Sequence, residues 1–115
     1  MIDIHTHIIY DVDDGSDTIE ESVAILKSAV SSGVTDIILT PHYIEINEYN
    51  KEKVRENFAS LKNEVEKQNI NIKLHMGNEI AIYGNVLQIL NEGEITPLAN
   101  SKYINFGIHL TCYKL

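Results

Sequence analysis

The chain has 115 residues, of which 17 are acidic and 9 are basic, so its formal net charge at pH 7 is −8. A chain this acidic has no basic stripe with which to neutralise phosphates, which argues against nucleic-acid binding and attraction to anionic membranes and favours the binding of cations. The length suits one domain, and an apolar content of 43% is enough to build a hydrophobic core.

The sequence contains few features that indicate a cellular location. No run of about 18 apolar residues occurs, and the N-terminus lacks a basic segment followed by an apolar one, so neither a membrane span nor a secretory signal is predicted. The single cysteine, Cys112, cannot form an internal disulfide, which agrees with a reducing compartment. A cytoplasmic location is therefore expected.

Short β-branched runs alternate with stretches of helical periodicity, which is typical of βαβ units with a parallel sheet, so the predicted fold class is α/β. Residues 1–6 alternate apolar and polar and predict the first strand. Thr18 and Glu21 form a capping-box pattern for a helix that Gly33 should end. The apolar residues of this helix share one face: Ile19, Val23, Leu26 and Val30. After the helix, residues 35–40 predict the second strand.

The same spacing predicts a second helix over residues 51–68. Residues 70–74 predict a third strand that continues towards Glu79, residues 85–90 a shorter helix, and residues 101–106 a fourth strand. No internal repeat or interdomain linker is present. The apolar residues of the second helix are Val54, Phe58, Leu61 and Val65.

The first strand ends in His5-Thr6-His7. Side chains two apart on a strand point to the same face, so two imidazoles in this spacing can converge on one metal ion. An isolated pair of this kind is more often two half-exposed histidines at a strand end. Ligand sites of parallel α/β folds, however, gather at the carboxyl ends of strands, which favours the metal interpretation here.

The following loop, residues 11–15, carries three carboxylates, among them Asp14. An EF-hand loop needs Gly at position 6 and Glu at position 12, whereas counting from Asp11 places Gly15 at position 5 and Ser22 at position 12, so a calcium loop of that type is excluded. The alternative is a solvated turn before a helix N-terminus, where carboxylates are favoured. That alternative explains Asp17 better than it explains Asp14.

The next two predicted strands also end in ligand-type residues, His42 in Thr40-Pro41-His42 and Glu79 in Gly77-Asn78-Glu79. Together with His5, His7 and Asp14 they form a candidate metal site. Imidazole and carboxylate ligands suit manganese, iron or zinc better than calcium or copper. His75 would share a face with Glu79 only in a regular strand, which Gly77 makes doubtful.

Other hydrolytic chemistries lack their motifs. A cysteine-dependent phosphatase needs an arginine a few residues after its thiolate, and Cys112 is followed only by Tyr-Lys-Leu. Neither a GxSxG elbow nor a GxxxxGK[ST] phosphate loop occurs. These observations exclude a cysteine-dependent phosphatase, an α/β-hydrolase and a P-loop protein.

The segments MIDIHTHIIYDVDDGS, TPH at 40–42 and GNEI at 77–80 together resemble the polymerase and histidinol phosphatase (PHP) superfamily. They resemble most closely its manganese-dependent protein-tyrosine phosphatases of bacterial capsule and exopolysaccharide clusters, the CpsB/CapC group. The resemblance covers residues 1–103. It implies the N-terminal part of a distorted TIM-like barrel whose strand ends hold a cluster of metal ions, commonly three.

By this resemblance the metal ligands are His5, His7, Asp14, His42 and Glu79, and the cofactor is Mn²⁺. The implied reaction is hydrolysis of phosphotyrosine by a metal-activated hydroxide. The implied substrates are the tyrosine-rich tails of autophosphorylating bacterial kinases that regulate capsule synthesis. No individual catalytic side chain is assigned.

Residues 104–115 depart from the family pattern. The later metal ligands and the phosphate-binding arginines of the family have no counterpart here, and we assign these roles neither to His109 nor to the single arginine, Arg55. A complete barrel needs about 250 residues. We therefore expect one incomplete PHP-type domain over 1–115, arising from truncation, for example by a frameshift near codon 104. Such a domain should be marginally stable or associate. Two alternatives remain, an inactive metal-binding or interaction fragment and a PHP hydrolase of a small phosphate ester such as histidinol phosphate.

Overall fold

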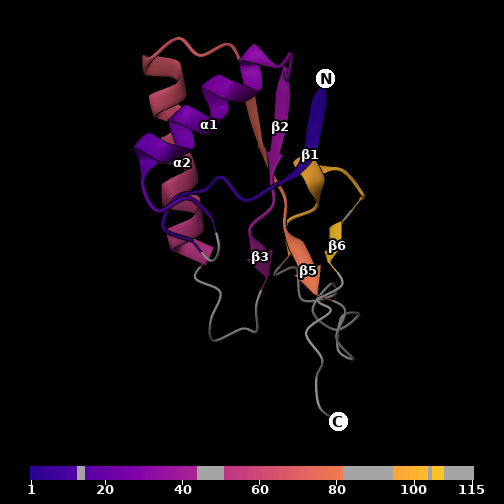
Figure 1. The fold of residues 1–115 in the computed structure, drawn as a ribbon. Coiled ribbons are helices and arrows are strands. Elements are labelled where there is room, and N and C mark those ends of the chain that lie inside the picture. The colour runs from indigo at the N-terminus through magenta and orange to yellow at the C-terminus, as the bar shows by residue number, and fades with distance from the viewer. Residues whose placement is uncertain (13–14, 44–50, 82–94, 104, 108–115) are drawn as a thin grey trace, which may run out of the picture.

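The computed structural model of the chain describes residues 1–12, 15–43, 51–81, 95–103 and 105–107. Two ladders of three parallel strands and two long helices make up these residues, so the α/β class and the parallel sheet are confirmed (Figure 1). In chain order the elements are β1 (Ile2–Thr6), α1 (Ile19–Ser31), β2 (Asp36–Leu39), β3 (His42–Tyr43), α2 (Lys51–Lys67), β4 (Lys73–Met76), β5 (Glu79–Ala81), the 3₁₀ turn η1 (Leu98–Asn100) and β6 (Asn105–Gly107).

The two ladders share one register. Strand β2 pairs with β4 and β3 pairs with β5 at the same offset of 37 positions, as in Asp36 with Lys73 and His42 with Glu79. Across the break, the Glu79 N–H donates to the Pro41 carbonyl at 3.1 Å. The predicted third strand therefore reaches Glu79 only as two strands, β4 and β5, separated at Gly77 and Asn78, and the register is the same on both sides of the interruption.

Strand β2 lies between β1 and β4 in one ladder, and β5 lies between β3 and β6 in the other. When β2 and β3 are taken as one interrupted strand, and β4 and β5 as another, the strands lie in chain order. Doubly wound sheets instead reverse their strand order at a switch point, so consecutive order favours barrel winding.

Among the described residues no helix is long and apolar enough to cross a membrane.

Two boundaries differ from the prediction. The third strand begins at Lys73 and not at residue 70, because Asn69 takes a left-handed conformation (φ 53°) and the Ile70 N–H donates to the Val65 carbonyl to close α2. The fourth strand exists but its ladder residues begin at Asn105, after η1. The helix predicted over 85–90 lies outside the described residues.

Helix α1 begins and ends as predicted. The Thr18 hydroxyl accepts from the Glu21 N–H at 3.2 Å, and Gly33 follows the helix with a φ of 90°. The return contact of the capping box is displaced by one residue, because the Glu21 carboxylate accepts from the Asp17 N–H at 3.0 Å. Both contacts satisfy N–H groups at the helix start.

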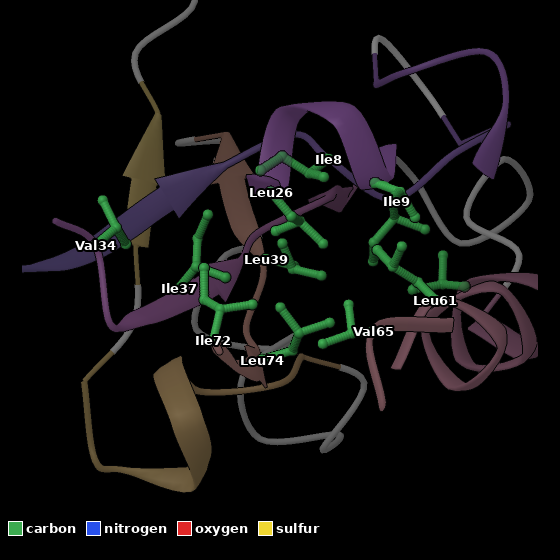
Figure 2. Packing of buried hydrophobic residues seen from close by; sticks show 12 residues of the cluster. Ile8, Ile9, Leu26, Val34, Ile37, Leu39, Leu61, Val65, Ile72 and Leu74 are labelled. Carbon is green, nitrogen blue, oxygen red and sulfur yellow. The ribbon is translucent and has the colours of Figure 1, made fainter. Parts of the chain in front are cut away.

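Helices α1 and α2 cover the same face of the sheet (Figure 1), and the hydrophobic core lies between them and the strands (Figure 2). Leu26 and Leu61 from the helices are completely buried against Ile37 and Leu39 of β2. Burial of side chains of this size contributes about 1.5–3 kcal/mol each. On β1, by contrast, Ile2 and Ile4 are exposed.

Candidate metal centre

Strand β1 contains a bulge beside His5, and His7 directly follows the strand. The pairing of β1 with β2 shifts by one position between Asp3 and Thr6, so β1 contains one extra residue there. Bulges locally redirect side chains and are frequent beside functional sites. The Nε2 atoms of His5 and His7 lie 3.0 Å apart. The two rings converge as expected from their spacing, although the strand itself is not regular.

Glu79 at the start of β5 lies at the middle of the cluster. Its Oε2 atom lies 3.0 Å from His5 Nε2, 2.8 Å from His7 Nε2 and 3.2 Å from His42 Nδ1. The rings of His7 and His42 are also in contact, with centroids 4.5 Å apart. One carboxylate oxygen is thus surrounded by three imidazole nitrogens.

The sheet explains this convergence. His42 and Glu79 are direct register partners on parallel strands, so their side chains share a face and lie side by side. His5 lies near the end of β1, which pairs with β2 in the other ladder, and His7 directly follows β1. Residues 74 positions apart in the chain thereby lie within 3.0 Å of each other.

The cluster is graded in exposure from one side to the other. The Glu79 side chain is 9% exposed, whereas that of His5 is 42% exposed. His7 and His42 lie between these values. The carboxylate is therefore anchored at the base of the cluster, and His5 forms its accessible rim.

The donor set fits a divalent cation. Nε2 of His5, Nε2 of His7 and a Glu79 oxygen lie within 4.8 Å of one another. Two nitrogens bound at about 2.1 Å to one ion lie about 3 Å apart when they subtend a right angle at it, which matches the spacing between these atoms. If two neutral imidazoles both donated to one oxygen, their N–H groups would be forced close together, which is unfavourable. A cation instead accepts a lone pair from the nitrogen of each ring.

The loop after His7 folds back onto the strand through buried hydroxyls. The Ser16 and Ser22 hydroxyls both donate to the Ile8 carbonyl, at 3.0 Å and 2.5 Å. The Asn57 amide of α2 donates to the Tyr10 carbonyl at 2.9 Å. These contacts hold the chain on both sides of the segment that includes Asp14, which itself lies outside the described residues.

Two buried polar side chains that the sequence analysis did not single out lie directly beside the cluster. Thr40 and Asn78 are both completely buried. Thr40 hydrogen-bonds to the backbone of Thr6 on β1, and Asn78 hydrogen-bonds to the carbonyl of Pro41 just before β3. Their positions in the sequence carried a signal, because Asn78 immediately precedes Glu79 and Thr40 lies two residues before His42.

His75 is separate from the cluster. Its Nε2 lies 3.1 Å from Asp36 Oδ2 on the adjacent strand. This hydrogen bond is the main cause that lowers the pKa of Asp36 below its ordinary value, and a hydrogen bond from Thr35 acts in the same direction. Burial opposes them, and the charge of Lys73 adds a smaller lowering effect. His75 is thus hydrogen-bonded to Asp36 and does not belong to the cluster. His109 and Cys112 lie outside the described residues.

A family model for capsular polysaccharide synthesis, CpsB/CapC, matches residues 1–112 of the chain. The chain belongs to the CpsB/CapC family. The resemblance drawn from the motifs around His5, His42 and Glu79 is therefore confirmed.

Members of the CpsB/CapC family from several bacteria are similar to this chain. CapC of Staphylococcus aureus is 39% identical over 105 residues, which cover 90% of this chain and 41% of that protein. The tyrosine-protein phosphatase CpsB of Streptococcus pneumoniae is 37% identical over 117 residues, which cover 99% of this chain and 48% of that protein. The chain spans less than half the length of these curated relatives.

A solved structure of the CpsB/CapC family has the same fold. It comes from work on YwqE of Bacillus subtilis and CpsB of Streptococcus pneumoniae, described as unique metal-dependent tyrosine phosphatases, and superposes with a TM-score of 0.83 at 36% identity. The match covers 92% of this chain and 43% of that one. The fold of this chain is thus part of the family's PHP-type fold.

Proposed function

We propose that this chain provides a metal centre for the hydrolysis of phosphotyrosine. The observation that supports this most directly is the convergence of three imidazole nitrogens on one Glu79 oxygen at 2.8–3.2 Å. The family relatives named tyrosine-protein phosphatases, and a structural neighbour described as metal-dependent, support the same reaction class.

In this proposal His5, His7, His42 and Glu79 hold the metal, with Asp14 as a further ligand, and the metal is Mn²⁺. A divalent ion supplies acidified water as a nucleophile and a positive charge for the phosphoryl oxygens. The largely buried Glu79 offsets part of the charge of the ion and orients the three imidazoles. Exposed His5 marks the side from which a substrate reaches the site.

The proposed substrates are phosphotyrosine side chains in the tyrosine-rich tail of a bacterial autokinase, in the cytoplasm. A tail of this kind is an extended peptide that can approach the accessible rim at His5 without unfolding a domain. The net charge of −8 disfavours nucleic-acid phosphates as competing substrates.

A second candidate is metal binding without turnover. The single arginine of the chain, Arg55, lies exposed on α2, and Lys53 of the same helix pairs with Asp11 at 3.1 Å. Cations that clamp a transferring phosphoryl group stabilise its transition state, and neither of these side chains belongs to the histidine and glutamate cluster.

Turnover assays with a matched pair of histidine variants test the proposal. Hydrolysis of p-nitrophenyl phosphate, a phosphotyrosine peptide and histidinol phosphate is measured with and without Mn²⁺ for the native chain, His5→Ala and His75→Ala. We expect Mn²⁺-dependent hydrolysis of the phosphotyrosine peptide that His5→Ala loses and His75→Ala retains. Preference for histidinol phosphate would contradict the substrate, and Mn²⁺ binding without any turnover would support the second candidate.

A further inference from the structure

Each ligand-bearing strand is tied to its neighbour by a completely buried polar side chain. These side chains, Thr40 and Asn78, are both 0% exposed and lie one or two residues upstream of a proposed ligand. Burying a polar side chain is unfavourable unless it is hydrogen-bonded, so its partners identify what it holds in place.

Thr40 forms hydrogen bonds with Thr6, the residue between His5 and His7. Its Oγ1 accepts from the Thr6 N–H at 3.1 Å and donates to the Thr6 carbonyl at 3.2 Å, while the Thr40 N–H also donates to that carbonyl at 2.8 Å. Both backbone groups of the residue that separates His5 from His7 are thereby fixed to the end of β2. This contact lies immediately after the bulge, where the regular ladder is interrupted.

Asn78 has the equivalent place one strand further on. Its side-chain amide donates to the carbonyl of Pro41, the residue before His42, at 3.1 Å, and its carbonyl accepts from the Thr96 N–H at 2.8 Å. Asn78 is itself the residue before Glu79. One side chain therefore links the backbone beside two of the proposed ligands and anchors both to a segment that follows β5.

We propose that Thr40 and Asn78 are positioning residues that set the spacing of the metal ligands, Thr40 for His5 and His7 and Asn78 for His42 and Glu79. This inference rests on the proposed metal centre. The bulge in β1 and the break between β2 and β3 remove regular ladder contacts where the ligands need fixed positions, and the two side chains replace these contacts. Residues that orient metal ligands typically change metal affinity about 10- to 100-fold when they are mutated.

The test compares two substitutions at Thr40. Thr40→Val keeps the shape and removes the hydroxyl, whereas Thr40→Ser keeps the hydroxyl and removes the methyl. We expect the dissociation constant for Mn²⁺, measured by titration calorimetry on the full chain, to rise about 10-fold or more in Thr40→Val. It should stay within about threefold of the native value in Thr40→Ser. Asn78→Leu should weaken Mn²⁺ binding like Thr40→Val.

A core variant separates positioning from general destabilisation. Val65→Ala on α2 removes buried methyl groups from the helix-covered face and should lower stability without changing Mn²⁺ affinity. Equal loss of affinity in Val65→Ala and Thr40→Val at matched stability would overturn the proposal, as would native affinity in Thr40→Val.

The metal-free protein provides an independent readout. The ring resonances of His5 and His7 in NMR spectra should shift in Thr40→Val and not in Val65→Ala, because only the former releases Thr6. If the native chain binds no Mn²⁺, the proposed function fails, and these resonances alone decide whether Thr40 positions the histidines. Unchanged ring resonances in Thr40→Val would then contradict it.

Discussion

Gly15 lies where the loop after the histidines returns to its own strand. A Cβ atom at this position would lie 2.4 Å from the Ile9 carbonyl oxygen and 3.2 Å from that of His7. Because real Cβ atoms do not approach backbone oxygens this closely, only glycine permits the loop to pack against the strand that carries the histidines.

Gly15→Ala should therefore destabilise the chain by about 1–3 kcal/mol, as overpacking typically does, and weaken Mn²⁺ binding. Denaturant unfolding and calorimetric titration measure the two effects. Gly33→Ala is the control, since a Cβ there meets no atom within 4 Å and only the φ of 90° is unfavourable. Native Mn²⁺ affinity in Gly15→Ala would show that this packing does not support the site.

The pair of Asp36 and His75 predicts a pH effect. Because the pKa of Asp36 is lowered in the folded chain, its carboxylate stabilises the fold above its unfolded pKa, and this stabilisation is lost as the pH falls through the folded pKa. Asp36→Asn should accordingly be less stable than the native chain at pH 7, and the difference should shrink in acid. Unfolding free energies measured between pH 7 and pH 3 test this, and a difference independent of pH would contradict it.

At the residue scale, the sequence predicted the candidate metal ligands better than the side chains that hold the backbone beside them. His5, His7, His42 and Glu79 were recognisable because each follows or ends a strand pattern, and the structure brings all four together. Thr40 and Asn78 were not recognised, because their partners are backbone groups of other strands, whose positions depend on the tertiary register.

At the scale of elements, helix α2 contributes Leu61 to the core. This side chain is completely buried between α2, α1 and the sheet. Leu61→Ala should reduce the free energy of unfolding by about 2–5 kcal/mol. Ile25→Ala on the exposed side of α1 is the matched control and should change it by less than about 1 kcal/mol. Chemical denaturation measures both, and equal losses would contradict the orientation of the helices.

Periodicity predicted α1 and α2 to within a residue at most ends, because several apolar residues spaced along one helix face are a long, redundant signal. The bulge in β1 and the left-handed Asn69 were not predicted. Both depend on what the neighbouring strand or helix requires of the backbone, and a short segment carries too few residues to specify them locally.

At the scale of the whole molecule, the metal should stabilise the fold. The cluster joins the end of β1 to the starts of β3 and β5, so an ion that binds only the folded chain shifts its unfolding equilibrium. At 100 times its dissociation constant, Mn²⁺ should add about 2.7 kcal/mol and raise the melting temperature. Thermal scans with Mn²⁺ and with a chelator measure this. His75→Ala should keep the rise and His5→Ala should lose it, whereas an identical rise in both would place the ion elsewhere.

Association of the chain stays a prediction at this scale. Ile2 and Ile4 are exposed on β1, which has one strand neighbour among the described residues. Exposed apolar strands of this kind favour pairing with another chain. Light scattering over a range of concentrations tests it, with Ile4→Lys expected to reduce the apparent mass and no effect counting against the surface.

The common register of the two ladders has a consequence for how such chains can change length. His42 meets Glu79 only while both strands have the same number of residues between the pair Leu39 and Met76 and the pair His42 and Glu79. A residue gained or lost within 36–43 or 73–81 turns one of these side chains to the opposite face. Residues gained or lost in the connection between the strands leave the offset in space intact. Insertions and deletions should therefore be tolerated between the strands and rejected within them.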